Sequence, residues 1–339
     1  MTWFQDLTGF PETSAKEVRA KLELDGFHIT SKANGRTYNA GRFSTPALQQ
    51  LRLDIKLPIV EDEKADDAKR IAVSQIVADV RALHQDHTNS NAVFQVASQF
   101  NCLEMVAPHV SPEDGIGIYQ NDLTQGPICC ICAGAGTIYR NYFANVNGQL
   151  GQTSNCQIDC LAGIGRHFGN AAHQHWQMQN GYCFPTKAGL KEVEQQLAGS
   201  VESQLNEIRG KLRVGVQSQT EVTVGESNHL VTQVFCSALP IAYSRIGSHH
   251  WNHFPRLVLD AAYEATFYIA LQNYIATGCP LLYLTLVGGG VFGNKLSWIL
   301  ASVERAITMF ANCQLDVKIV SYGSSSPDIT ELIHRVNST

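Results

Sequence analysis

Three carboxylates gather in one short, glycine-containing stretch of the sequence. Glu113, Asp114 and Asp122 lie within SPEDGIGIYQNDLTQGP, and Gln120 and Asn121 precede the last of them. A carboxylate can stabilise a developing positive charge, orient hydroxyl groups or activate water. Asp114 and Asp122 do not share a helix face, so they can act together only if the loop folds back over a ligand. We expect these two aspartates to be catalytic.

Each acid in this part of the sequence also has a structural interpretation. Asp114-Gly115 is a common turn pair, and Asp122 could cap a helix that starts near Thr124. Glu104 precedes this stretch, and we expect it to be a solvated or hydrogen-bonded loop acid. The sequence leaves both interpretations open for the two aspartates.

A second candidate for chemistry is the glycine cluster in LLYLTLVGGGVFGNKLSWIL, residues 281–300. Without side chains at Gly288, Gly289, Gly290 and Gly293, the backbone can adopt positive φ and approach an anion such as a diphosphate closely. The alternative is a glycine turn needed only for packing. The Walker motif fails because Lys295 is not followed by Ser or Thr, and a dinucleotide fingerprint would open the first βαβ unit with G-x-G-x-x-G spacing.

These residues must be positioned by alternating strands and helices. Apolar runs followed by amphipathic segments in the last third indicate a layered α/β domain with a partly parallel sheet. The spacing predicts a helix over 61–87, strands over 92–97, 281–287 and 317–322, and helices over 257–277, 295–311 and 329–336.

The order of these motifs resembles the macrodomain and poly(ADP-ribose) glycohydrolase-like superfamily. Gly290-Val291-Phe292-Gly293 lies between a late strand and a helix that leads to the final strand, and VFQVASQFNCLE is similar to the strand that ends in the ribose-side Asn. The resemblance covers about residues 90–140 and 212–339. It implies a three-layer α/β/α fold with a mixed central sheet. The Asn-Ala-Ala-Asn run and the glycine-to-glutamate signature of the superfamily are absent.

The resemblance also implies an ADP-ribose site. The glycine loop would wrap the diphosphate, Phe292 and Asn101 would lie near the distal ribose, and Tyr322 would contact the adenosine end. The residues expected to bind ADP-ribose are Gln99, Asn101, Thr124, Gln125, Gly126, Gly289, Gly290, Val291, Phe292, Gly293, Asn294 and Tyr322.

The function implied is hydrolysis of a glycosidic bond to mono-ADP-ribose on a protein side chain. The acid loop also resembles that of an effector hydrolase of this superfamily that acts on ADP-ribosylated arginine of ubiquitin, so we expect an arginine linkage and name ubiquitin as a candidate carrier. The main alternative is an ADP-ribose reader without catalysis. A nucleotide-dependent oxidoreductase is a third class.

Composition and charge argue against several other classes of protein. The chain has 339 residues, 44% of them hydrophobic, and its 25 basic and 30 acidic residues are dispersed, with a net charge of −5. We therefore expect no nucleic-acid partner. No apolar run predicts a membrane span or secretory leader, so a cytoplasmic protein is expected. We expect an N-terminal extension over 1–60 packed on the core, and a domain over 61–339 with an insertion at about 143–210.

Cysteine and histidine clusters raise the question of a metal. Cys129, Cys130 and Cys132 lie among Ile, Ala and Gly residues that indicate packing, and His249 and His253 are followed by Pro255. We expect neither a metal nor a cofactor.

Overall fold

A seven-stranded mixed sheet forms the centre of the protein. The computed structural model describes residues 1–57, 70–225 and 227–338. The strand order is β4-β11-β12-β6-β13-β14-β5. The strands β12, β6, β13, β14 and β5 are parallel, and β11 is antiparallel to both of its neighbours, β12 and β4. The strands are β4 (Arg42–Ser44), β5 (Ala72–Val77), β6 (Val93–Ala97), β11 (Gly215–Glu221), β12 (Leu230–Cys236), β13 (Leu281–Leu284) and β14 (Asp316–Ser321).

The central strands are apolar because helices cover both of their faces. Val93, Phe94 and Val96 of β6 are buried, as are Leu282 and Leu284 of β13. The parallel strands end at the same edge of the sheet, which brings together the segments that follow β6, β12, β13 and β14. All the candidate binding loops lie along this edge.

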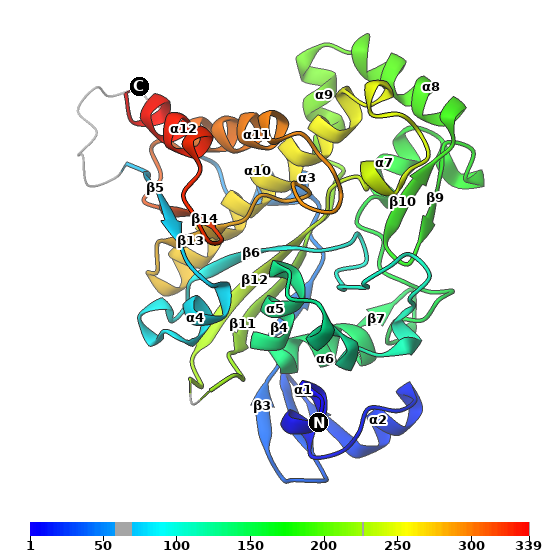
Figure 1. The fold of residues 1–339 in the computed structure, drawn as a ribbon, viewed down its shortest axis with the longest axis vertical. Coiled ribbons are helices and arrows are strands. Elements are labelled where there is room, and N and C mark those ends of the chain that lie inside the picture. Colours follow the sequence, from blue (N-terminus) through cyan, green and yellow to red (C-terminus); the bar gives the residue numbers. More distant parts are fainter. Residues whose placement is uncertain (58–69, 226, 339) are drawn as a thin grey trace.

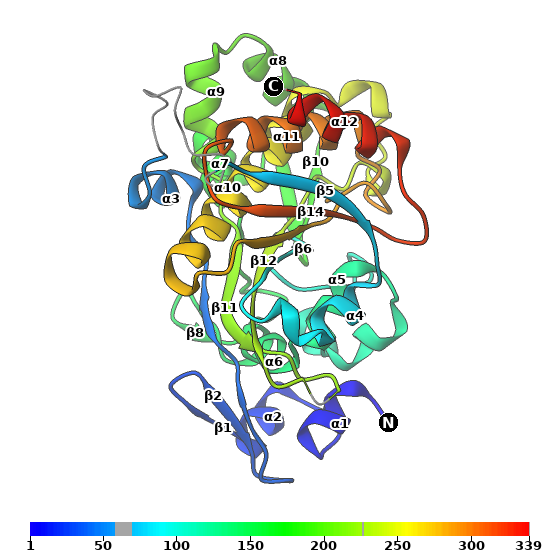
Figure 2. The same ribbon diagram turned by 90° about the vertical axis from the view of Figure 1, so that its left-hand side faces the viewer.

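Two helical layers enclose the sheet (Figures 1 and 2). One contains α10 (His253–Thr277), α11 (Leu296–Met309) and α12 (Pro327–Asn337), and the other contains α4 (Val80–Gln85), α5 (Gln125–Cys132) and α6 (Gly134–Tyr142). This confirms the predicted three-layer α/β/α fold with a mixed central sheet. Within the described ranges, no helix combines the length and apolarity needed to cross a membrane.

The N-terminal residues form a small unit below the sheet in Figure 1. It contains α1 (Trp3–Thr8), α2 (Ala15–Lys21) and a sheet of β1 (Leu22–Asp25), β2 (His28–Ser31) and β3 (Thr37–Asn39). The chain then enters the central sheet as β4 and continues into α3 (Leu48–Asp54), which packs on α10. The first 57 residues therefore contribute an edge strand to the central sheet as well as a separate unit.

Residues 143–210 lie beside one end of the central sheet, in the green part of Figure 1. The segment forms two hairpins and three helices. These are β7 (Asn145–Val146), β8 (Gln149–Leu150), α7 (Ala162–His167), β9 (Trp176–Gln179), β10 (Tyr182–Pro185), α8 (Lys187–Ala198) and α9 (Glu202–Arg209).

The helix predicted over residues 61–87 is wrong for the part that the structure describes. Residues 61–69 lie outside the described residues, but Ala72–Val77 forms strand β5 and only Val80–Gln85 is helical. All six residues of β5 pair with β14, from Ala72 opposite Asp316 to Val77 opposite Ser321. A partner strand more than 240 positions away outweighs local helical spacing, because ladder hydrogen bonds and burial decide between the two conformations.

Candidate active site

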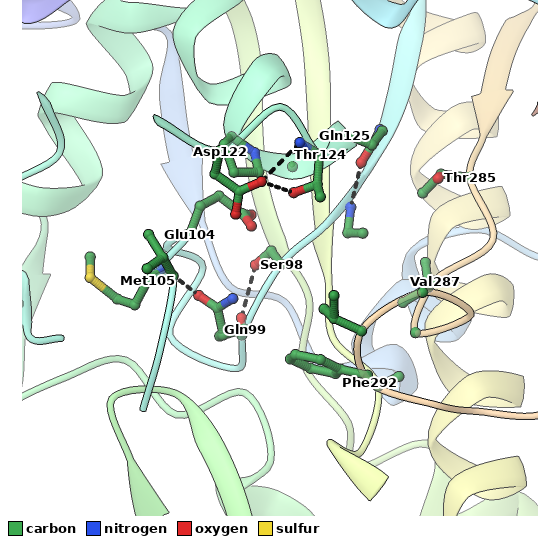
Figure 3. A pocket seen from close by; sticks show the side chains of 18 of the residues that line it. Ser98, Gln99, Glu104, Met105, Asp122, Thr124, Gln125, Thr285, Val287 and Phe292 are labelled. Atoms are coloured by element: carbon green, nitrogen blue, oxygen red, sulfur yellow. Dashed lines mark hydrogen bonds between the residues drawn. The ribbon is translucent and has the colours of Figure 1, made fainter. Parts of the chain in front are cut away.

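A long cleft follows the edge of the sheet where the parallel strands end. It consists of two adjoining compartments of about 460 and 510 Å³, which share Thr124, Gln125, Thr285 and Leu286 as lining residues. Both volumes lie in the range of small-molecule sites. Figure 3 shows the first compartment, between the segment after β6, the start of α5 and the loop after β13.

The conformation of the glycine loop after β13 is stabilised by contacts with the chain that follows β12. Gly288 and Gly293 have φ of 77° and 72°, and a Cβ on Gly288 would lie 2.4 Å from the Ala238 Cβ. Asn294 donates from its backbone N to the Gly288 carbonyl and from Nδ2 to the Leu239 carbonyl, at 3.0 and 2.9 Å. These residues fix the loop, since glycine adopts positive φ without strain.

The middle of the same loop faces the cleft. Gly290, Val291 and Phe292 line the first compartment, and a Cβ on Gly290 would meet no atom within 4 Å. Of the residues predicted to bind in this loop, these three line the cleft, whereas Gly289, Gly293 and Asn294 are not among its lining residues. The loop thus divides into a cleft-facing part and a supporting part.

An aromatic wall connects the insertion to this loop. Phe292 packs against Tyr182 of β10 and against Tyr243, with ring centroids 5.5 and 5.7 Å apart. Tyr182 donates a hydrogen bond from its hydroxyl to the Met105 carbonyl at 2.6 Å. The segment 143–210 therefore supplies one wall of the cleft and holds the chain beyond β6.

The start of α5 forms the floor between the compartments. The Gln125 side chain accepts a hydrogen bond from Ala97 N at 2.9 Å and donates to the Gln95 carbonyl at 2.8 Å, which ties the helix to β6. A Cβ on Gly126 would lie 2.1 Å from the Ala97 carbonyl, so only glycine allows this approach. The exposed N-terminus of a helix favours an anion at this point.

Glu104 is buried in the wall of the first compartment. Its exposed fraction is 4%, and Oε1 has no hydrogen-bond partner among the described residues. Its backbone N donates to the Tyr119 hydroxyl at 3.0 Å. Burial raises the pKa of the Glu104 carboxyl well above its usual range; the positive charge of Arg140 opposes this shift and the negative charge of Asp122 adds to it. Burial thus favours the protonated form of Glu104 relative to an exposed glutamate.

Asp122 lies half-buried in the same compartment, at the end of the 3-10 helix η4 (Gly117–Asn121). Its Oδ1 accepts hydrogen bonds from Thr124 N at 2.9 Å and Thr124 Oγ1 at 2.7 Å. Figure 3 shows Asp122 and Glu104 with their carboxyl groups on the same side of the cleft. Asp122 thus lines the cleft and also fixes the turn that leads into α5.

Besides Gly289, Gly293 and Asn294, two further predicted site residues lie outside both compartments. Asp114 is exposed, and its Oδ2 accepts hydrogen bonds from Ser111 N and Oγ at 2.7 and 3.0 Å. It caps a short 3-10 helix, so the turn interpretation describes it and the predicted pair with Asp122 does not form. Asn101 is fully buried with Nδ2 donating to Gln157 Oε1 at 2.9 Å, and it faces the insertion. The structure therefore places neither side chain among the residues that line the cleft.

The remaining predicted binding residues divide between the two compartments. Gln99 and Gly126 line the first one, and the Gln99 side chain is fixed by a hydrogen bond from Met105 N to Oε1 at 2.7 Å. Tyr322 follows β14 at the rim of the second compartment, and its exposed fraction is 86%. An exposed aromatic ring at a cleft rim is available to a planar group of a ligand.

The two compartments together suit an elongated ligand with an anionic middle. The cleft offers a helix N-terminus and an open glycine loop near its centre, two carboxyl groups in one compartment, and an aromatic rim in the other. Among the described residues, no group of three or more His, Cys, Asp or Glu side chains could hold a metal ion. The arrangement can bind a diphosphate-linked molecule and present carboxyl groups to one end of it.

Glu104 lines the cleft as a buried acid, although it was not among the site residues predicted from the sequence. The sequence predicts a solvated or hydrogen-bonded loop acid, but the side chain is buried against α5, where a Cβ on Gly126 would lie 2.4 Å from its Oε2. The signal that could have identified it is its place seven residues after the end of β6, at the ligand-binding edge of a parallel sheet.

Comparison with known proteins gives matches among solved structures alone. No protein-family model and no curated protein sequence matches the chain. A poly(ADP-ribose) glycohydrolase from Deinococcus radiodurans in complex with ADP-ribose is 10% identical, with a TM-score of 0.40 over 88% of this chain and 93% of that one.

Two structures of a poly(ADP-ribose) glycohydrolase from Thermomonospora curvata are similar to the same degree. One is 14% identical, with a TM-score of 0.41 over 95% of this chain and 97% of that one. The other, bound to the inhibitor ADP-HPD, is 13% identical, with a TM-score of 0.41 over 96% of each chain. These values are too low to assign a family or an activity, so the functional argument depends on the cleft.

Proposed function

We propose that the protein is an ADP-ribosyl glycohydrolase. It binds ADP-ribose along the cleft with the diphosphate between the start of α5 and Gly290, the adenosine toward Tyr322, and the distal ribose toward Glu104 and Asp122. The single observation that carries the catalytic part is Glu104: a buried carboxyl with a raised pKa, whose Oε1 has no partner among the described residues, in a ligand-sized cleft beside a second carboxyl.

A buried carboxyl without a partner destabilises a protein, so it persists where a ligand uses it. Glycoside hydrolysis commonly employs two carboxyl groups with different protonation states. Glu104 has the raised pKa that suits a general acid. Asp122, held by Thr124, can stabilise the charge that develops on the ribose.

The reaction then needs only the two acids and water. Glu104 donates its proton to the leaving group as the bond to the anomeric carbon breaks, and the positive charge of the ribose faces Asp122. A water molecule attacks the anomeric carbon and gives a proton to the Glu104 carboxylate, which restores the acid. The products are ADP-ribose and the unmodified side chain.

For the substrate, we propose mono-ADP-ribose on an arginine side chain, with ubiquitin as a candidate carrier. The support is the resemblance of the acid loop described above, together with the chemistry of the linkage. Cleavage of an arginine linkage releases a guanidine, which is a strong base, and a neutral carboxyl beside it can supply the proton. No cofactor takes part in this scheme.

A substrate panel tests the proposed function. The protein is incubated with ADP-ribosylated arginine, serine and glutamate peptides and with poly(ADP-ribose), and free ADP-ribose is measured over time. We expect release, fastest from the arginine peptide. Release from another linkage alone would overturn the arginine assignment, and binding of ADP-ribose without release from any substrate would favour a reader.

A further inference from the structure

One carboxylate of the N-terminal unit reaches the loop that carries the cleft acids. Glu12 lies between α1 and α2, and its Oε1 accepts a hydrogen bond from Ile116 N at 2.9 Å while Oε2 accepts one from Gly117 N at 2.6 Å. The Tyr142 hydroxyl also donates to Oε1. Both oxygens of the carboxylate are thus engaged with chain segments more than 100 residues away.

The loop is shaped to accept this side chain. A Cβ on Gly115 or Gly117 would lie 2.6 or 2.8 Å from Glu12 Oε2, and Gly115 has a φ of 87°. Trp3 adds a second attachment, because its Nε1 donates to the Ile116 carbonyl at 3.0 Å and its backbone N donates to Gln120 Oε1 at 3.1 Å. Charged acceptors of backbone N–H groups form stronger hydrogen bonds than neutral ones.

The element held in this way is η4, and η4 is connected to both cleft acids. Asp122 follows its last residue directly. Tyr119, in the middle of η4, is buried and its hydroxyl accepts the hydrogen bond from the Glu104 backbone. A shift of η4 would therefore move one carboxyl through the chain and release the other from its backbone support.

We propose that Glu12 is a positioning residue for both cleft carboxyl groups and acts through η4. This inference rests on the proposed function where it concerns catalysis. Glu12 does not line the cleft, and the hydrogen bonds given above join it to η4 and its preceding residue and to Tyr142, not to the glycine loop or Tyr322. Because the glycine loop and Tyr322 lie on other elements than η4, loss of Glu12 is expected to affect the chemical step more than ligand binding.

The test compares Glu12→Gln with Glu23→Gln as the matched control. An amide keeps the size of the side chain but presents an NH₂ group to donors, so one of the hydrogen bonds is lost. Glu23 is an exposed acid of the same N-terminal unit, on β1. For each variant, kcat and KM for ADP-ribose release and the Kd of ADP-ribose are measured, with thermal unfolding as a check on folding.

We expect Glu12→Gln to lower kcat at least about tenfold, since small displacements of catalytic groups are costly, and to change the Kd less than about twofold. Glu23→Gln is expected to match the wild type. A kcat within about twofold of the wild type, or equal losses of kcat and affinity, would overturn the proposal. Tyr142→Phe removes one donor to Glu12 and provides the same test, with a smaller expected effect, if Glu12→Gln does not fold.

Hydrogen exchange separates this inference from the proposed function. If the wild type releases no ADP-ribose, the proposed function fails, but the mechanical link can still be measured. Glu12→Gln is expected to speed amide exchange over residues 116–122 and at Glu104, with exchange of the glycine loop unchanged. Unchanged exchange at Glu104 would contradict the link through Tyr119.

Discussion

At the residue scale, Glu104 combines a cost in stability with the catalytic role that we propose for it. Its carboxyl is buried, its Oε1 has no partner among the described residues, and burial raises its pKa. The buried positive charge of Arg140 opposes this rise in pKa, and its guanidinium donates hydrogen bonds to neutral groups such as the Cys102 carbonyl and Thr137 Oγ1. Titratable residues in a cleft whose pKa is strongly shifted by burial and by neighbouring charges are often functional.

The raised pKa of Glu104 makes stability depend on pH. Between the ordinary carboxyl pKa and the raised one, the folded state holds a proton that the unfolded state has lost, so stability falls as pH rises through this range. Glu104→Gln removes the titration. We expect its melting temperature to exceed that of the wild type by an amount that grows with pH, as measured by thermal unfolding across a pH series.

The same titration should appear in the reaction. Because the protonated form of Glu104 is the acid, kcat is expected to fall as pH rises through its raised pKa. A wild-type kcat that stays constant at pH values above the raised pKa, where the stability difference no longer grows, would contradict the assignment of Glu104 as the acid.

Asp114 provides the complementary test at the residue scale. Its carboxyl caps a surface turn through Ser111. Asp114→Asn keeps an acceptor for this turn, so hydrolysis is expected to stay within about twofold of the wild type, since surface substitutions of this kind have small effects. A large loss of kcat without a loss of stability would return Asp114 to the catalytic pair.

At the scale of elements, two glycines of the loop after β13 line the cleft but differ in the space around them. Gly288 needs positive φ and has no room for a Cβ, whereas Gly290 has open space around it. The loop is rigid at its ends and open toward the cleft, which suits a backbone cradle for an anion.

This division predicts different results for two alanine variants. Gly288→Ala is expected to lower the free energy of unfolding by about 2 kcal/mol or more, because it combines backbone strain with a close contact. Gly290→Ala is expected to leave stability nearly unchanged and to weaken ADP-ribose binding. Denaturant unfolding and calorimetric titration measure the two effects, and equal losses of stability in both variants would contradict this account of the loop.

The sequence predicted elements well where local pattern and final environment agree. The strand over 281–287, the following helix and the strand over 317–322 appear as β13, α11 and β14. The prediction failed over Ala72–Val77, where pairing with β14 determines the structure. For the site, Asp122 and Gly290 follow from motif position, but the burial of Glu104 and the orientation of Asn101 depend on α5 and the insertion. Single-sequence spacing does not contain these long-range contacts.

At the scale of the whole molecule, three separate parts of the chain converge on one cleft. The central sheet supplies the edge, the insertion supplies Tyr182, and the N-terminal unit supports η4 through Glu12. The compartments share their middle residues but differ at their ends, with carboxyl groups at one end and an exposed Tyr322 at the other. Chemistry and affinity should therefore respond to different substitutions.

Tyr322→Ala tests whether a substitution at the adenosine end of the cleft changes affinity without changing catalysis. The ring is 86% exposed, so its loss should not change stability. Loss of one aromatic contact worth about 1 kcal/mol weakens ADP-ribose binding roughly fivefold, with kcat retained at saturating substrate. Titration calorimetry and steady-state kinetics measure both quantities, and an unchanged Kd would remove Tyr322 from the site.

The most direct test of the central claim compares ADP-ribose release by the wild type and by Glu104→Gln. On an ADP-ribosylated arginine peptide, the account predicts release by the wild type and a rate at least about 100-fold lower for the variant, because a positioned acid contributes this much or more. The affinity of both proteins for ADP-ribose should agree within about twofold. A variant that releases ADP-ribose at the wild-type rate would contradict the claim that Glu104 performs the chemistry of this cleft.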